Sequence, residues 1–290
     1  MNHKFEPYLN VLGFYEAVPK PSAEELRDFY ANKYYQMPKG TYTGDYPEED
    51  LVWFRNTARA AAQTADRIRL DRSLLDLGCG EGFFTKAFMT FGWDVACCDF
   101  SEFGVATHNK ELMPYFTVGD IYESINLYQS RSRVFGLINL QNVLEHVIDP
   151  EELLSKIKAL MSEKSSLRIR VPNDYSDFQL ALVDKGLTSS TWFTPPDHLS
   201  YFNNDGLAAL LAHCGYKIHS LQADFPMEMF LVNPHANYWK DRTLGKGAHR
   251  ARVFCENYLI ERDVSAYVEY CEVAGKLGFG RNLIAYASPA

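Results

Sequence analysis

The pattern of apolar and polar positions changes after the first 70 residues of the chain. Before that point it predicts two helices, at residues 22–32 and 48–68, separated by tyrosines and turn residues. Ser22 precedes Glu25 by three positions, which is the spacing of a capping box at the start of the first helix. We therefore interpret residues 1–70 as a helical N-terminal cap.

From residue 73 onward, short apolar runs alternate with helical stretches, as a parallel sheet with crossover helices requires. The runs that predict strands are residues 73–77, 94–99, 115–119, 134–140 and 166–172, followed by 216–222 and 282–288. This order favours an α/β fold with a seven-stranded, doubly wound, Rossmann-like sheet. We place the core at residues 71–222 and the final core strand at residues 281–290.

Residues 223–280 form an insert between the last two expected strands. A loop of this length without structure is uncommon, so we expect the insert to be helical. It carries a basic stretch at residues 238–252, whose cations are Lys240, Arg242, Lys246, Arg250 and Arg252. These cations could clamp a diphosphate, and the alternatives are a solvated helix face or a subunit contact.

The first strand-to-helix turn of the core, within LLDLGCGEGFF, holds Gly78, Gly80 and Gly82. Glycine lets the backbone approach a ligand closely, and the following helix offers N–H groups to an anionic group. Asp99 ends the second core strand, where it could accept hydrogen bonds from both ribose hydroxyls. Together these features predict a nucleoside-containing ligand without identifying it. The third glycine comes one position too early for the dinucleotide fingerprint, which weakens the NAD alternative.

Several ordered motifs resemble those of class I S-adenosylmethionine-dependent methyltransferases. LLDLGCGEGFFT looks like their first motif, and FGLINLQNVLEHVIDP is similar to the fourth-strand segment of the branch that includes the ubiquinone-biosynthesis O-methyltransferases. RIRVPND and PPDHLSYFNNDGLAALLAHCGYKI also resemble that branch, so the match covers residues 73–222. The resemblance implies the class I methyltransferase sheet with S-adenosylmethionine as cofactor. Gly136 stands where the family often has an acid, a departure expected to affect packing more than chemistry.

The resemblance also implies a set of residues around the cofactor. Those implied for the methionine part are Asp76, Gly78, Cys79, Gly80, Gly82, Gln141 and Asn142. Those implied for the nucleoside are Asp99 at the ribose and Asp120 and Ile121 near the adenine, with Phe100, next to Asp99, as a further cofactor-binding residue. Arg55 is a further candidate, for the cofactor carboxylate, and no metal is expected. For the acids, hydrogen bonds within a turn or to a helix end are the alternative.

His198 in PPDHLSYF and His146 in LEHV are the candidate catalytic residues. An imidazole titrates near neutral pH and could remove the proton of an acceptor hydroxyl. For each histidine the alternative is a hydrogen bond that holds its own loop. The tyrosines at positions 34, 35, 42 and 46 are candidates for a lid over the site, with simple packing as the alternative.

Composition narrows the acceptor to a small molecule. The net charge of -8 argues against nucleic acid as a partner. The chain has no apolar run long enough to span a bilayer and no signal-peptide pattern, and its six cysteines show no CxxC spacing, so we expect a cytoplasmic protein with reduced thiols and no membrane partner.

The preferred acceptor is a hydroxyl of a sugar or nucleotide-linked sugar in surface-polysaccharide or natural-product biosynthesis. The alternatives are N- or C-methylation of another small metabolite, an NAD-dependent oxidoreductase, or a binding module without catalysis. A homodimer is left open.

Overall fold

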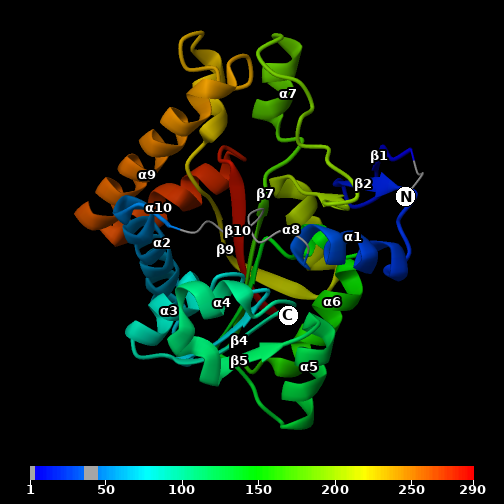
Figure 1. The fold of residues 1–290 in the computed structure, drawn as a ribbon, viewed down its shortest axis with the longest axis vertical. Coiled ribbons are helices and arrows are strands. Elements are labelled where there is room, and N and C mark those ends of the chain that lie inside the picture. The colour runs from blue at the N-terminus through cyan, green and yellow to red at the C-terminus, as the bar shows by residue number, and fades with distance from the viewer. Residues whose placement is uncertain (1–3, 36–44) are drawn as a thin grey trace.

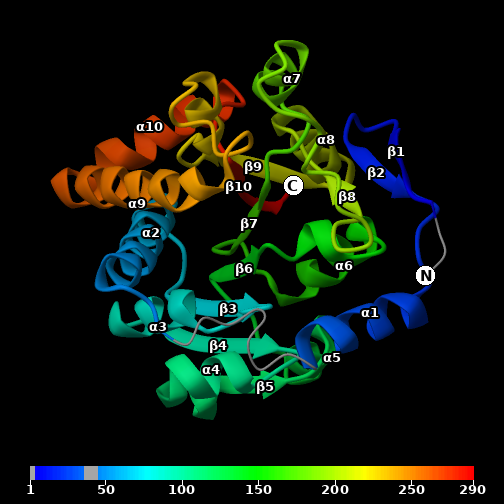
Figure 2. The ribbon, with the colours of Figure 1, turned by 45° about the horizontal axis from the view of Figure 1, so that its top comes forward.

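The structure is a computed structural model that describes residues 4–35 and 45–290. Its centre is a seven-stranded sheet, drawn in Figures 1 and 2. In sheet order the strands are β5 (Phe116–Val118), β4 (Asp94–Asp99), β3 (Ser73–Leu77), β6 (Leu137–Gln141), β7 (Ser166–Pro172), β10 (Asn282–Pro289) and β9 (Tyr216–Ala223). β10 runs antiparallel to both of its neighbours, whereas the pairs from β5 to β7 are parallel. The seven-stranded Rossmann-like sheet expected from the sequence is therefore confirmed.

The strand order reverses direction at β3. This strand pairs with β4 on one side and with β6 on the other, although β6 follows two strands later in the chain. The connections that leave β3 and β6 then diverge, which opens a crevice beyond the carboxyl ends of the two strands. The fold therefore offers a ligand site at the glycine turn that follows β3.

Helices cover both faces of the sheet (Figure 2). On one face lie α2 (Glu48–Arg67), α3 (Phe83–Thr90) and α10 (Val264–Lys276). On the other lie α5 (Ile121–Ser130), α6 (Pro150–Ile157) and α8 (Asn204–His213). The remaining helical segments are α1 (Ala23–Tyr35), α4 (Phe103–His108), η1 (Lys110–Tyr115), η2 (Leu144–His146), η3 (Lys158–Leu160), α7 (Asp177–Asp184), η4 (Met227–Val232), η5 (Arg242–Leu244) and α9 (Gly245–Arg262). Buried apolar side chains fill the space between sheet and helices on both faces.

The N-terminal segment contains the two expected helices, α1 and α2. The capping box forms as predicted: the Ser22 N–H donates to Glu25 Oε2 (2.9 Å), and the Glu25 N–H donates to Ser22 Oγ (3.2 Å). The segment also contains a hairpin that the sequence did not indicate, β1 (Glu6–Leu9) and β2 (Tyr15–Val18), which pairs with β8 (Ser200–Tyr201). All four residues of β1 are exposed, so this strand has no apolar alternation from which it could be recognised.

The insert is helical, as expected, and its helix α9 docks on α2. Trp53 Nε1 of α2 donates to Glu256 Oε2 (2.8 Å), and the hydroxyl of Tyr267 donates to Glu256 Oε1 (2.6 Å). Arg252 lies over the Trp53 ring at 4.6 Å, and Arg250 pairs with Glu49 at 3.1 Å. Two cations of the basic stretch therefore hold α9 against α2.

Over the described ranges, every helix is too short or too polar to span a membrane.

Gly136 gives a test of the packing ahead of β6. A Cβ at this position would overlap the backbone carbonyl oxygen of Asp71, which explains why the acid common in the family does not fit here. We expect Gly136→Ala to lower the free energy of unfolding by about 1–3 kcal/mol, because the backbone must shift to admit the methyl group.

The matched control is Gly247→Ala in α9, where an added Cβ would meet nothing within 4 Å in the described structure. Alanine in place of a helical glycine should raise the free energy of unfolding by about 0.4–1 kcal/mol. Urea unfolding followed by circular dichroism measures both variants. Equal stability of the two variants would contradict the packing described for Gly136.

Candidate active site

A cavity of about 210 Å³ lies at the carboxyl ends of β3 and β6. Six of its lining residues are among those expected at the cofactor, namely Asp76, Gly78, Cys79, Gly80, Gln141 and Asn142. The other six were not anticipated, namely Phe54, Thr57, Glu81, Phe83, Phe84 and Asn139. The structure therefore brings together six of the seven residues expected at the methionine part of the cofactor, and it adds an aromatic wall.

The glycines of the turn serve different purposes. A Cβ on Gly78 would come within 2.6 Å of Val143 Cγ2, so glycine is needed there for close packing. A Cβ on Gly80 would meet no described heavy atom within 4 Å, and Gly80 has φ of 57°, which favours glycine. Gly80 thus presents bare backbone to the cavity. Gly82 does not line the cavity and precedes the first residue of α3.

Asp76 is buried in the cavity wall, with both carboxylate oxygens hydrogen-bonded. Oδ2 accepts from the Thr85 hydroxyl (2.6 Å), and Oδ1 accepts from Asn139 Nδ2 (2.7 Å). Burial raises the pKa of Asp76 above its usual value. The two bonds fix the side chain under the glycine turn.

Arg168 of β7 continues this network toward the centre of the sheet. Its Nη1 donates to Asn139 Oδ1 (2.6 Å) and to Gln141 Oε1 (3.1 Å), and its Nε donates to the hydroxyl of Tyr286 (3.2 Å). The guanidinium also lies 4.8 Å from the centre of the Phe84 ring. Sequence reasoning assigned Arg168 no role, although a cation between the apolar residues Leu167 and Ile169 of an expected core strand is a signal that could have been used.

Asp99 lies beneath the glycine turn and outside the cavity lining. Its Oδ2 accepts from the Gly80 N–H (2.9 Å), and its Oδ1 accepts from the Ser101 N–H (3.3 Å). Burial raises the pKa of Asp99. The carboxylate thus holds the turn in place and stands at the end of β4, where the sequence predicted a ribose acceptor.

The other residues expected at the nucleoside also lie outside the lining. Asp120 caps α5, accepting from the Tyr122 N–H (2.6 Å), so the helix-end alternative describes what its side chain does. Ile121 packs in the core at 7% exposure, and Phe100 is 49% exposed. Arg55 is an exposed residue of α2 and does not line the cavity.

An aromatic group borders the cavity beside α2. Phe54 and Phe83 stack at 4.6 Å, and Tyr46 meets both rings edge-on at 5.2 and 5.4 Å. The Tyr46 hydroxyl donates to Glu81 Oε2 (2.7 Å). Of the other candidate lid residues, Tyr42 and the side chains of Tyr34 and Tyr35 lie outside the described part of the chain.

The two candidate catalytic histidines lie together, although His146 follows β6 and His198 comes just before β8. Their rings are 4.8 Å apart and nearly perpendicular. His146 Nδ1 is 2.6 Å from the backbone carbonyl oxygen of Asp197. A carbonyl oxygen can only accept, so Nδ1 carries the proton and Nε2 is the accepting nitrogen of the neutral ring.

Glu145 joins this pair, which sequence reasoning did not anticipate. It is 1% exposed, its Oε1 lies 3.9 Å from His146 Nε2, and burial raises its pKa to about 8. One potential ligand atom each from Glu145, His146 and His198 lies within 4.8 Å of the others, a spacing that a metal ion could share. The expectation that the chain holds no metal stays a prediction.

The sequence profile of a family described as a methyltransferase domain matches residues 48–221. The chain belongs to this methyltransferase family. Together with the seven-stranded sheet, this confirms the class I S-adenosylmethionine-dependent methyltransferase implied by the motifs, with S-adenosylmethionine as cofactor.

Two curated relatives are both named ubiquinone biosynthesis O-methyltransferase. One, from Coxiella burnetii, is 24% identical over 168 residues, covering 54% of this chain and 71% of that protein. The other, from Nitrosomonas europaea, is 22% identical over 173 residues, covering 53% and 73%. A crystal structure of a SAM-dependent methyltransferase from Archaeoglobus fulgidus shares the fold, with a TM-score of 0.50 at 17% identity over 92% of this chain and 99% of that one.

The cavity of the methyltransferase fits this cofactor chemically. The open backbone at Gly80 leaves room against the turn, and the amides of Gln141 and Asn142 can bind the charged groups of an amino acid. The rings of Phe54 and Phe83 provide a water-poor wall. The lining therefore suits the amino-acid end of the cofactor, whereas the residues expected at its nucleoside lie outside this lining.

Asp99→Ala tests how the turn is held. We expect affinity for S-adenosylhomocysteine to fall by about 1–3 kcal/mol, because the Gly80 N–H loses its charged acceptor and the end of β4 loses a carboxylate. Titration calorimetry measures the change, with Asp94→Ala, an exposed residue at the start of the same strand, as control. Unchanged affinity in Asp99→Ala would remove this residue from the site.

Glu145→Gln tests the buried carboxyl group. Between its ordinary pKa of 4.5 and about 8, the folded chain keeps a proton that the unfolded chain has released. Wild-type stability should therefore fall across this range as pH rises, and the variant should gain relative to the wild type. Urea unfolding at several pH values, with EDTA present, measures the difference.

The exposed Glu163→Gln is the control for that experiment. A difference between Glu145→Gln and the wild type that stays constant with pH would contradict the raised pKa.

Proposed function

We propose that this methyltransferase transfers the methyl group of S-adenosylmethionine to a hydroxyl oxygen of a small molecule, with a sugar or nucleotide-linked sugar as the preferred acceptor. The observation that carries oxygen as the target is the contact of His198 with His146, which follows the cavity residue Asn142 by four positions in the chain. Both curated relatives are named O-methyltransferases, which supports oxygen over nitrogen or carbon.

In this proposal the residues of the chain bind the cofactor, orient the acceptor and remove the proton of its hydroxyl group. The cofactor supplies a methyl group already activated by its sulfonium. Gly80, Gln141 and Asn142 hold the amino-acid end, and Asp99 accepts from the ribose. Phe54 and Phe83 exclude water from the cavity, which favours transfer to the acceptor over loss to solvent.

His146 acts as the general base. The Asp197 carbonyl oxygen fixes the proton on Nδ1, so Nε2 takes the proton of the acceptor hydroxyl. Burial raises the pKa of Glu145 to about 8, so its carboxyl group, 3.9 Å from Nε2, is largely uncharged at neutral pH. The Asp197 carboxylate lies 3.8 Å from Nδ1, where it can stabilise the imidazolium that forms when Nε2 takes the proton. His198 packs against the base and positions it.

The contacts of the basic stretch support a nucleotide-linked acceptor less than they support a sugar acceptor. Arg250 and Arg252 are engaged with α2, and Lys240 and Lys246 are exposed. Arg242 lines a cavity together with Tyr238 and Trp239 of the insert. We therefore favour recognition through the sugar over a five-cation clamp on a diphosphate. A cytoplasmic location and a homodimer stay predictions.

His146→Gln is the first test of the mechanism. We expect kcat to fall by about 10²–10⁴-fold, since a general base contributes on that order. Affinity for S-adenosylhomocysteine should change little. The matched control is His213→Gln, at an exposed ion pair with Glu151 at the end of α8. Equal losses in turnover and cofactor affinity would show that His146 is structural.

An acceptor screen tests the activity itself. The protein with labelled S-adenosylmethionine is offered monosaccharides, nucleotide sugars, catechols and amines, and mass spectrometry identifies methylated products. A methyl ether on a sugar supports the proposal. Transfer only to an amine or a carbon would contradict oxygen as the target atom. Transfer only to a phenol would contradict the sugar as the acceptor.

A further inference from the structure

A second cavity, of about 360 Å³, is lined partly by residues of the insert. It is bordered by α7, by the loop around Trp192, and by η4 and η5 at the beginning of the insert. Its lining residues differ from those of the cofactor cavity throughout. Family resemblance assigned none of them a role.

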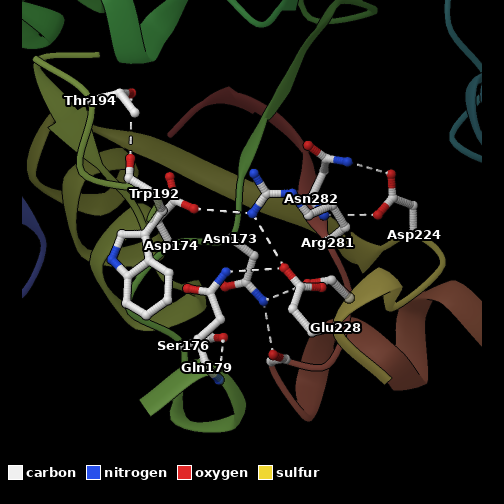
Figure 3. Close-up of polar contacts among 12 residues, drawn as sticks. Asn173, Asp174, Ser176, Gln179, Trp192, Thr194, Asp224, Glu228, Arg281 and Asn282 are labelled. Carbon is white, nitrogen blue, oxygen red and sulfur yellow. Dashed lines mark hydrogen bonds and ion pairs between the residues drawn. The ribbon is translucent and has the colours of Figure 1, made fainter. Parts of the chain in front are cut away.

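Buried polar groups form one wall of this second cavity (Figure 3). Gln179 and Glu228 are 2% and 7% exposed, and Gln179 Nε2 donates to Glu228 Oε1 (3.1 Å). Arg281 pairs with Glu228 (3.3 Å) and with Asp174 (3.2 Å), which holds the Glu228 carboxylate in place.

The donation to Glu228 fixes the orientation of the Gln179 amide, since only its nitrogen can donate to a carboxylate. Gln179 Oε1 has no hydrogen-bond partner within the described structure and almost no exposed surface, although the residue lines the cavity. A buried acceptor without a partner is costly, so a donor from a ligand would stabilise this wall.

Aromatic side chains form the rest of the cavity. Trp192, Tyr238 and Trp239 line it, together with Thr188. Arg242 of η5 adds a cation at the exposed side. The combination suits a ring with an apolar face and several hydroxyls at its edge.

We propose that this second cavity binds a sugar ring of the acceptor, with ring hydroxyls donating to Gln179 and Glu228 and the ring lying against Tyr238 and Trp239. A catechol carries only two hydroxyls, so it would leave more of the polar wall without partners. Leaving buried polar groups unpaired is a strong source of discrimination. A polyhydroxylated ring is therefore the better match.

The position of the cavity is consistent with an acceptor site. β6 and β7 are parallel neighbours, so their carboxyl ends open at the same edge of the sheet. Arg170 of β7 donates to Asn142 Oδ1 (3.2 Å) in the cofactor cavity and to Asp224 Oδ2 (2.9 Å). Asp224 Oδ1 accepts from the backbone N–H of Asn282 (2.8 Å), the residue that follows Arg281 in the chain.

The role of the second cavity in catalysis rests on the proposed function, but sugar binding can be tested alone.

The test titrates the full chain with methyl α-D-glucopyranoside, methyl α-L-rhamnopyranoside, UDP-glucose and catechol. Trp192 and Trp239 are two of the four tryptophans, so their fluorescence reports on the cavity. We expect at least one sugar probe to change the fluorescence in a saturable way. Gln179→Met should weaken that binding by roughly five- to hundred-fold, because it removes the amide.

Trp239→Leu should weaken the same binding and leave Trp192 as the reporter. The control is Phe254→Leu, a 71% exposed aromatic residue on α9 away from the cavity. Circular dichroism and calorimetry with S-adenosylhomocysteine check that each variant is folded and still binds cofactor. If Gln179→Met fails to fold, Trp239→Leu decides the outcome.

The outcomes separate this inference from the proposed function. Sugar binding that Gln179→Met and Trp239→Leu weaken supports the cavity, even where no sugar is methylated and the proposed function fails. Methyl transfer to a sugar with KM unchanged in both variants would overturn the cavity assignment and leave the proposed function standing. Saturable binding of catechol alone would also overturn it.

Discussion

The buried contact of Arg168 with Asn139, and through it with Asp76, is the interaction on which the site depends. It joins β7, β6 and β3 beneath the cavity, and Arg168 also bonds Gln141 and Tyr286. A cation inside a sheet is tolerated only when its donors are satisfied, so these side chains are held in fixed positions. These hydrogen bonds therefore set the positions of the polar side chains in the cavity floor.

The insert contributes to the same site from the other side. Glu256 of α9 accepts a hydrogen bond from Trp53 of α2. This contact fixes α2, the helix that carries Phe54 and Thr57 into the cavity. The insert also supplies Glu228, Tyr238, Trp239 and Arg242 to the second cavity. A segment absent from a minimal sheet thus supports the cofactor wall and builds the surface on which we place acceptor recognition.

Much of the fold could be predicted because the residues that build it are local. β3, β4 and β7 have the residues expected from their apolar runs, and the Ser22–Glu25 capping box marks the start of α1. The glycine turn could be placed at the cavity because it directly follows β3. Gln141 could be placed there because it is the last residue of β6. β1 could not be predicted, since its stability comes from pairing rather than from an apolar face.

The rest of the site depends on contacts between distant segments. Phe54 and Asn139 reach the cavity only through helix docking and strand register, and Glu145 meets His198 only after the loop beyond β7 folds back. The same limit explains Arg55, which was expected at the cofactor. Its helix lies beside the cavity, but docking against α9 turns Phe54 and Thr57 inward and leaves Arg55 exposed.

A crystal structure of the protein with S-adenosylhomocysteine tests the central claim most directly, because it shows where the cofactor lies. The account predicts the amino-acid end against Gly80 and Gln141 and the ribose hydroxyls on the Asp99 carboxylate. The cofactor product bound elsewhere, with the turn cavity holding only solvent, would contradict it.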